Sequence, residues 1–332
     1  FSNDAKGALL LEPTRSNLVI TSASGTYGNS PSSETNTISP DGTNNAIIPT
    51  IGSNANRYQY LINGGTYSTN TKLTYSWYRK RISTPMVDTY LGDLRPSGLN
   101  LSYVGDTKQI QSNINGYDRF EAVLNITDGS ATTTVRMYFG DVIGVDNSSI
   151  AYWGHQLEQQ SYATSYIPTQ GSAVTRVADV CNNAGNDQVI NSTEGVLYFE
   201  GSALTSIQSS TVMMSIGNES SNFIRIGYQQ GANLFFAEST GTLNGIGIYS
   251  VSITSLINSK IALSYKENDV KLYINGVLAA TDTVFTAFAS NTLNTIRFDS
   301  GGGSGNLNAN IKDLRVYNTS LTDAELINLT TI

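Results

Sequence analysis

The segment Lys260–Thr281 constrains the fold more than any other part of the chain. Apolar residues alternate with smaller or polar ones at 261–265 and again at 270–274, with a turn between them. Asn275-Gly276 then leads into a further apolar run, and Asn-Gly between apolar strands favours a type I′ hairpin because both residues tolerate positive φ. We therefore expect three consecutive antiparallel strands.

Short segments of the same kind recur along the chain, each bounded by Gly, Asn, Asp or Pro. Most of them alternate in character, which predicts sheets with one buried face. In the first half the expected strands are 9–11, 57–62, 72–81, 99–104, 119–126, 133–142 and 150–157. In the second half they are 195–201, 212–216, 223–228, 233–237 and 246–253. The polar stretch 21–45 is expected to be a loop or a series of very short strands.

The length of 332 residues favours two hydrophobic cores. The periodic pattern breaks between Tyr166 and Asn191, where turn formers replace apolar residues. We predict an all-β protein of two β-sandwich (jelly-roll) domains in tandem: residues 1–170, a linker at 171–192, and residues 193–332. One short C-terminal helix is expected, because Thr322 and Glu325 have the spacing of a capping box.

Charge and cysteine content exclude several classes of partner and site. The net charge is −7, and no Lys/Arg cluster interleaves with aromatic residues, so we expect no nucleic-acid partner. The longest apolar runs are far shorter than the ~20 residues needed to cross a bilayer, so no membrane insertion is expected. The single cysteine, Cys181, rules out a disulfide within the chain and is expected to be a small buried residue.

Two separate segments of the first half resemble bacteriophage tail and fibre proteins. Residues 7–18 have the sequence GALLLEPTRSNL; residues 152–169 contain YWGHQLE and SYATSYIPT, followed by AVTR at 173–176. In the family these segments bracket one module, and His155 stands where a small residue is usual. The resemblance implies a carbohydrate-binding jelly roll between them, in which Ser39-Pro40-Asp41-Gly42-Thr43 matches a loop of the family.

The second half, from Glu194 onward, resembles concanavalin-like lectin/glucanase domains of the laminin-G kind. The resemblance is carried by ALSYK at 262–266, VKLYING at 270–276, IKDLRVY at 311–317 and LTDAEL at 321–326. It implies a fold rather than a function, because sandwich folds host lectins, enzymes and scaffolds alike.

No catalytic residue set is evident. Glycoside hydrolysis needs two flanking carboxylates, and the Glu-x-Asp-x-x-Glu arrangement of glucanases with this fold does not occur. A Ser-His-Asp triad would have to use His155, the only histidine, which we expect to be a structural or a surface residue. One Cys and one His do not supply a zinc site. We predict a protein that is not an enzyme.

Calcium is the metal that the loops favour, because it takes carboxylate, amide and backbone oxygens. The candidate ligands are Asp41, together with Asp146 and Asn147 near the closing strand. Ordinary turns are the alternative interpretation of these clusters. No cofactor is required.

Sugar binding needs exposed aromatic rings beside hydrogen-bonding side chains. The candidates are Trp77, Tyr78, Tyr90 and Tyr103 in the first domain and Tyr228 and Tyr249 in the second. At least half of such aromatic residues must be core. Strand alternation separates Trp77 from Tyr78, so at most one of the two is expected to face the core of its sheet.

We expect a non-catalytic fibre, spike or decoration protein on the virion surface, outside the cell, that binds host surface glycans. Its other expected partners are virion proteins and further copies of itself. The alternatives are an accessory carbohydrate-binding part of a secreted polysaccharide-degrading enzyme, and a purely structural virion scaffold. Because the sequence starts at Phe1 rather than Met, we expect a part of a longer chain.

Overall fold

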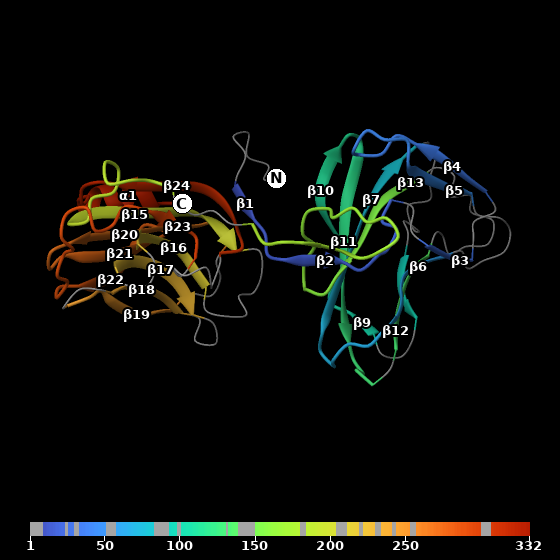
Figure 1. Cartoon of the computed structure of the whole chain (residues 1–332), viewed down its shortest axis with the longest axis horizontal. Coiled ribbons are helices and arrows are strands. Elements are labelled where there is room, and N and C mark those ends of the chain that lie inside the picture. Colours follow the sequence, from blue (N-terminus) through green and yellow to red (C-terminus); the bar gives the residue numbers. More distant parts are fainter. Residues whose placement is uncertain are drawn as a thin grey trace. The chain divides into compact units, whose positions relative to one another are not determined.

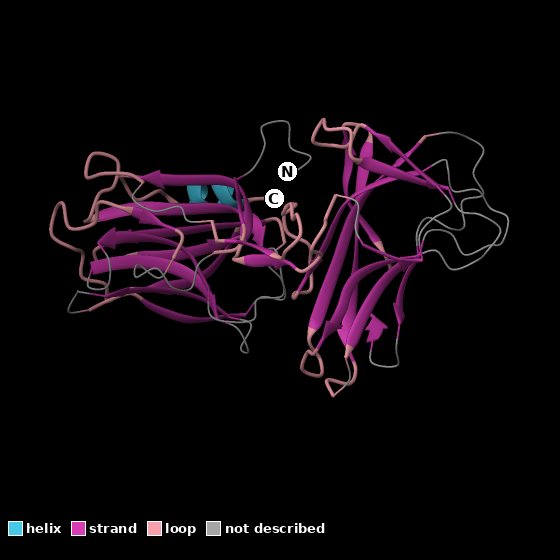
Figure 2. Ribbon diagram, turned by 45° about the vertical axis from the view of Figure 1, so that its right-hand side comes forward, coloured by secondary structure: helices cyan, strands magenta, loops and turns pink. Residues whose placement is uncertain are grey.

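The computed structural model describes residues 9–23, 26–29, 33–50, 58–82, 93–97, 101–130, 132–138, 150–179, 184–203, 211–218, 222–229, 234–240, 244–252, 257–299 and 307–332. Within these ranges the chain forms strands β1 to β24 and the short C-terminal helix α1 (Figure 2). The predicted all-β class, with sandwiches and one C-terminal helix, is confirmed. Of the helices in these ranges, none is long and apolar enough to cross a membrane.

The chain divides into two compact units. The insert unit is continuous and comprises Thr14–Val177, whereas the split unit combines Phe1–Pro13 with Ala178–Ile332. Strand β1 (Leu9–Leu11) belongs to the split unit because it pairs with β24 (Ala309–Tyr317) in antiparallel register. In sequence, the insert unit therefore interrupts the split unit after its first strand.

The split unit is a sandwich of two antiparallel sheets (Figure 1). The six-stranded sheet has the order β1-β24-β15-β20-β21-β22, and the five-stranded sheet has the order β19-β18-β17-β16-β23. The remaining bounds are β15 Glu194–Ala203, β16 Thr211–Asn218, β17 Asn222–Gln229, β18 Leu234–Thr240, β19 Gly247–Ser252, β20 Ser259–Lys266, β21 Val270–Ile274, β22 Val277–Asp282 and β23 Ile296–Arg297.

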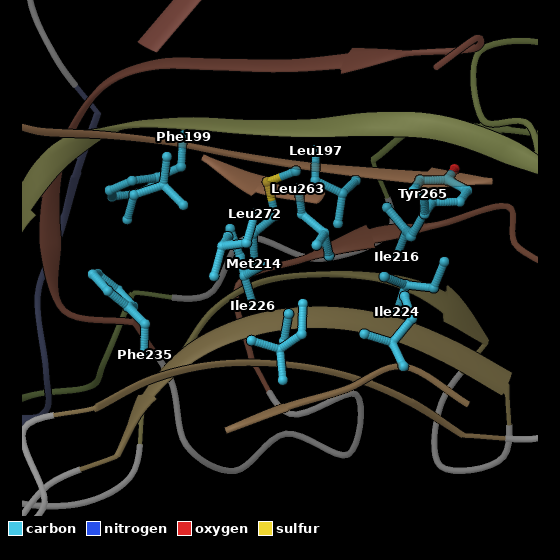
Figure 3. Packing of buried hydrophobic residues seen from close by; sticks show 14 of the residues in the cluster. Leu197, Phe199, Met214, Ile216, Ile224, Ile226, Phe235, Leu263, Tyr265 and Leu272 are labelled. Atoms are coloured by element: carbon cyan, nitrogen blue, oxygen red, sulfur yellow. The ribbon is translucent and has the colours of Figure 1, made fainter. Parts of the chain in front are cut away.

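The core of the split unit lies between these two sheets. Leu197 and Phe199 of β15 and Leu263 of β20 lie on one side of it, and Ile224 and Ile226 of β17 lie on the other (Figure 3). All five side chains are buried. Burial of such side chains from water stabilises each by about 1.5–3 kcal/mol, which makes this core the main source of the unit's stability.

Two local predictions from the sequence are confirmed in the split unit. Asn275 and Gly276 have φ angles of 52° and 81° and connect β21 to β22. Helix α1 (Asp323–Thr330) begins at a capping box in which Thr322 and Glu325 bond each other's backbone N–H groups. Its Leu326 is buried on the second face of the six-stranded sheet, in contact with a cluster that includes Val196, Tyr198, Ala262 and Tyr273.

In the described part of the insert unit there are three antiparallel sheets. The largest has the order β10-β11-β7-β13-β5-β4, with β9 also paired to β11; the others are β3-β6-β12-β8 and the short pair β14-β2. The bounds are β2 Arg15–Asn17, β3 Thr26–Asn29, β4 Ser33–Thr37, β5 Ala46–Thr50, β6 Tyr58–Gly65, β7 Lys72–Arg81, β8 Asp93–Ser97, β9 Leu101–Tyr103, β10 Lys108–Ile114, β11 Tyr117–Ile126, β12 Thr133–Tyr138, β13 Ile150–Glu158 and β14 Val174–Arg176.

The expectation of sheets with one buried face is wrong for β13. Strand β11 largely follows it, with buried and half-buried residues in near alternation, but all nine residues of β13 are buried. The reason is that apolar clusters lie on both faces of the sheet: Trp77 of β7 belongs to one, and Tyr78, its neighbour, belongs to the other. The second cluster includes Trp153 of β13, against which Tyr166 packs.

Candidate functional site

A pocket of about 610 Å³ lies in the insert unit beside β13. This volume falls within the roughly 300–1,000 Å³ typical of small-ligand sites. Its walls come from segments that are distant in sequence, namely the loop after β2, the loop before β5, β13, and the segment from Tyr166 to β14. The lining residues are Thr21, Ser22, Ala23, Asp41, Asn45, Trp153, Tyr166, Pro168, Thr169, Gln170 and Val174.

Two aromatic rings form one wall of the pocket. The ring centroids of Trp153 and Tyr166 are 4.5 Å apart, and the planes are inclined by 51°. Tyr78 packs edge-on against both rings, with centroids 5.3 Å from Trp153 and 6.3 Å from Tyr166. Trp153 is only 4% exposed, whereas Tyr166 is half-buried. Tyr166 is thus a partly exposed ring held by two buried ones.

A β-bulge in β13 brings these rings together. The pairing of β13 with β7 shifts register between Trp153 and Gln156, and Gly154 within the bulge has φ +66°. A Cβ atom at Gly154 would lie 2.8 Å from Cδ2 of Tyr78 and 3.5 Å from Cε2 of Tyr166. Bulges redirect side chains near functional sites. Here only glycine combines the left-handed backbone with this close approach to the rings.

Buried polar side chains of β13 hold the segment that carries Tyr166. Glu158 accepts hydrogen bonds from the backbone N–H of Thr164 at 2.9 Å and from its hydroxyl at 2.5 Å. Gln156 accepts from the backbone N–H of Ile167 at 2.7 Å and donates to Glu158 at 2.7 Å. Because these groups are buried, the bonds satisfy polar atoms that water does not reach. Segment 164–167 is therefore fixed on β13.

Arg119 lies in the same buried network. It is 2% exposed, and its Nη2 donates to the Ser76 hydroxyl at 2.9 Å and to the Thr164 carbonyl at 2.7 Å. Glu121 accepts from the backbone N–H of Ala163 at 2.8 Å, and burial raises the pKa of Glu121. Arg119 and Glu121 thus hydrogen-bond to the segment before Tyr166, and neither residue lines the pocket.

Ser22 connects the pocket's aromatic wall to its polar rim. Its hydroxyl lies 2.6 Å from the hydroxyl of Tyr166 and accepts from the backbone N–H of Thr169 at 2.8 Å. Burial raises the pKa of Tyr166 to about 12, so the phenol stays protonated at neutral pH. The hydrogen bond fixes the ring orientation of Tyr166.

The loop Ser39–Thr43 contributes Asp41 to the lining of the pocket. Oδ1 of Asp41 accepts from the Ser39 hydroxyl at 2.6 Å, the Thr43 hydroxyl at 2.7 Å and the Thr43 backbone N–H at 2.9 Å. Burial acts to raise the pKa of Asp41, but these hydrogen bonds outweigh it and lower that pKa. Asn115 and Tyr117 anchor the loop by donating to the carbonyls of Pro40 and Ile38 at 2.7 and 2.9 Å.

Two buried polar atoms of pocket residues have no hydrogen-bond partner within the described ranges. They are the indole Nε1 of Trp153 and the amide Oδ1 of Asn45. Leaving a buried donor or acceptor unpaired costs about 1–3 kcal/mol. Both atoms belong to residues of the pocket lining but are themselves buried from solvent.

The motif residues of 7–18 also support the pocket. Asn17, which is fully buried, donates to the carbonyls of His155 and Ile167 at 3.2 and 2.9 Å and accepts from the N–H of Leu157 at 3.1 Å. Arg15 donates to the Tyr162 hydroxyl at 3.2 Å and lies over its ring. Asn17 of the first segment thus contacts β13, which carries part of the second segment.

The structure places the predicted aromatic residues at separate positions. Trp77 is 1% exposed and stacks on Tyr75 and Phe120 in the insert-unit core, and Tyr228 packs edge-on against Phe235 in the split-unit core. Neither ring presents a face to solvent. Tyr78 is buried behind the pocket wall, whereas Tyr103 at the end of β9 is 43% exposed and does not line the pocket.

Of the other predicted site residues, only Asp41 has a described side chain. Asp41 lines the pocket. Tyr249 lies in β19, but its side chain is outside the described part, as are residues Tyr90, Asp146, Asn147 and Cys181. In the described ranges, no group of three or more His, Cys, Asp or Glu side chains is arranged to hold a metal ion. Calcium binding stays a prediction.

Sequence reasoning missed Trp153, Tyr166, Asn45 and Gln170 as pocket residues. Trp153 and Tyr166 belong to the segments that carry the family resemblance, but the sequence did not identify them as aromatic residues of a binding site. The pattern that could have found them is the pairing of Trp-Gly in a buried strand with Tyr-Ile-Pro shortly after it. Glycine beside an aromatic residue inside a strand indicates a bulge or a close approach.

The two sheets and interior core of the split unit define a jelly-roll β-sandwich of the concanavalin A type. The family model of the concanavalin A-like lectin/glucanases superfamily matches residues 202–327. The resemblance of the second half to this superfamily is thereby confirmed, and these residues form a concanavalin A-like lectin/glucanase domain. Among curated proteins, none matches the chain.

Several solved structures are similar to the chain at low identity. The CBM40 of Ruminococcus gnavus IT-sialidase, bound to alpha2,3 sialyllactose, is 17% identical over 46% of this chain and 95% of its own, with a TM-score of 0.37. The NanB sialidase of Streptococcus pneumoniae is 11% identical over 46% of this chain and 28% of its own, with a TM-score of 0.35. The SAP-like pentraxin of Limulus polyphemus is 11% identical over 44% of this chain and 72% of its own, with a TM-score of 0.33.

Proposed function

We propose that this protein is a non-catalytic glycan-binding protein and that the pocket of the insert unit is its binding site. The observation that carries the proposal is the partly exposed ring of Tyr166, which packs on Trp153 in a pocket that Asp41, Asn45 and Gln170 also line. A sugar packs its apolar face on an aromatic ring while its hydroxyls need polar partners. The pocket offers both within one concave surface.

The pocket is rigid before any ligand arrives. The Tyr166 hydroxyl bonds Ser22, the segment before it bonds Glu158 and Gln156, and Asp41 bonds its own loop. A site held in its binding geometry loses little conformational entropy on association. This matters for glycans, because a flexible hydroxylated ligand already loses entropy when it binds.

The described lining of the pocket holds one carboxylate rather than a pair, which supports a non-catalytic role. Of the described residues that line the pocket, Asp41 is the only acid. Glycoside hydrolysis commonly uses two carboxylates about 5–9.5 Å apart, one of them as the general acid. Asp41, with its lowered pKa, is ionised at neutral pH and does not supply the protonated acid.

The biological setting that we propose is a fibre, spike or decoration protein on a virion surface that recognises host surface glycans. Its support is the pair of phage-like segments, the first of which contacts β13 through Asn17. An accessory binding module of a secreted polysaccharide-degrading enzyme is the second candidate, and the same pocket would serve it. A purely structural role would leave the pocket without a ligand.

Binding to arrays of host-surface and plant oligosaccharides tests the proposal, followed by titration calorimetry on the strongest ligand. Tyr166→Ala and Gln170→Ala should each weaken binding at least tenfold, because the first removes the ring and the second an exposed hydrogen-bonding group. Tyr103→Ala, which removes an exposed tyrosine of the same unit away from the pocket, should leave affinity within twofold. Binding that is lost in Tyr103→Ala and kept in Tyr166→Ala would reject the pocket as the site.

A further inference from the structure

The charge of the pocket lining is negative. Among its lining residues within the described ranges there is no Lys, Arg or His, and the one charged side chain is the carboxylate of Asp41. Its Oδ1 accepts the three hydrogen bonds from Ser39 and Thr43, and Oδ2 has no described partner. One carboxylate oxygen therefore remains as an acceptor for a ligand.

Arg119, a cation behind the aromatic wall, is not available to a ligand. Arg119 is within electrostatic range of Tyr166, but its side chain is 2% exposed and donates to Ser76 and Thr164. It also lies 5.3 Å from the ring centroid of Tyr78, behind the aromatic wall. A ligand carboxylate in the pocket would thus face Asp41 without a positive group among the described lining residues.

Neutral hydroxyl groups suit the same carboxylate well. A hydroxyl can donate to Oδ2 of Asp41, the carboxylate oxygen that the loop's own hydrogen bonds leave available. Hydrogen bonds to a carboxylate are roughly twice as strong as those between neutral groups. An anionic group cannot donate in this way and is repelled by Asp41.

We infer that the pocket selects uncharged glycans and rejects sugars that carry a carboxylate or sulfate, such as sialylated or uronic-acid-containing glycans. This inference rests on the proposed function. It assigns Asp41 two tasks, acceptance of sugar hydroxyls and exclusion of anions. The net charge of −7 on the whole chain acts in the same direction at longer range.

Matched glycan pairs test the inference. The probes are lactose and 3′-sialyllactose, and neutral galactan and polygalacturonate fragments, followed by the strongest neutral array ligand and its carboxylated counterpart. The neutral member of a bound pair should bind at least tenfold more tightly. Asp41→Asn should weaken neutral binding by about tenfold and reduce the discrimination to less than threefold, because the amide no longer repels an anion.

Asp128→Asn is the matched control. Asp128 also accepts hydrogen bonds from a nearby serine, Ser130, in an exposed turn of the insert unit, and its removal changes the net charge equally. Discrimination should be unchanged in this variant. Preference for the anionic member, lost in Tyr166→Ala, would overturn the inference and leave the glycan site standing. No binding to any glycan would instead overturn the proposed function itself.

Discussion

The hydroxyl of Tyr75 and Nδ1 of His155 lie 2.6 Å apart inside the insert unit, where both side chains are fully buried. Their rings are nearly parallel, with centroids 6.1 Å apart. Burial lowers the pKa of His155 to about 3, well below the value of 6.5 for an exposed histidine. Of the two possibilities that the sequence left open for His155, a structural or a surface residue, its burial supports the structural one.

This burial should make the insert unit sensitive to mild acid. Between pH 6.5 and 3 the unfolded chain binds a proton at His155 that the folded chain does not, so the free energy of unfolding falls as the pH falls. The loss is at most about 1.4 kcal/mol per pH unit and roughly 5 kcal/mol over the whole window. Urea titrations at pH 7.5, 6.0 and 5.0 measure it, and no other histidine contributes.

His155→Gln provides the control for this titration. The amide keeps a hydrogen-bonding group for Tyr75 but does not titrate. The variant should be less stable at pH 7.5 because of imperfect packing, yet its stability should hardly change between pH 6.5 and 5. The same acid dependence in the variant and in the wild type would refute the assignment to His155.

Gly154→Ala should disrupt both stability and binding. The left-handed backbone costs a non-glycine residue about 1–2 kcal/mol, and overpacking against Tyr78 adds about 1–3 kcal/mol. Displacement of Trp153 should weaken glycan binding. Gly171→Ala is the matched control, because Gly171 has φ +84° and nothing within 4 Å of the added Cβ. Equal losses in the two variants would show that ring packing at Gly154 is unimportant.

Glu158→Gln should loosen the segment that carries Tyr166. The new amide group meets the N–H and hydroxyl of Thr164 and the amide of Gln156, so at least one buried donor loses its acceptor. We expect a loss of about 2–3 kcal/mol in unfolding free energy and weaker glycan binding. Glu267→Gln, at an exposed carboxylate that accepts from Ala287, should change stability by less than about 1 kcal/mol. Normal glycan binding by Glu158→Gln would show that Glu158 is not needed to hold Tyr166 in the binding site.

Thr322→Ala should destabilise only the split unit, by about 1 kcal/mol, because it removes the helix N-cap. Both tryptophans lie in the insert unit, so their fluorescence reports that unit alone. The urea midpoint by circular dichroism should fall while the fluorescence midpoint stays constant. Thr322→Ser, which keeps the hydroxyl, should restore stability; a shifted fluorescence midpoint would indicate that the two units unfold together.

Local physics made much of the fold predictable from the sequence. Alternation and turn residues located β7 and the strands from Lys260 to Thr281, and the capping box located α1. These features depend on residues that are neighbours in sequence. They carry the same preference in any tertiary context, which is why they were visible without a structure.

The pocket was not predictable in this way. It needs Asp41, Trp153 and Tyr166 to meet, and their meeting depends on the bulge at Gly154 and on bonds from Glu158. Nor does alternation alone tell that both Trp77 and Tyr78 are buried, because a second layer covers the other face of β7. Such layers result from contacts between distant segments.

The pairing of Leu9 with Ile311 has a consequence for biosynthesis. As the chain leaves the ribosome, the insert unit is complete once Val177 has emerged, and it can fold while the rest is still being translated. Strand β1 stays unpaired until its partner β24, about 300 residues downstream, has been synthesised. Its brevity keeps this exposed edge a poor template for aggregation.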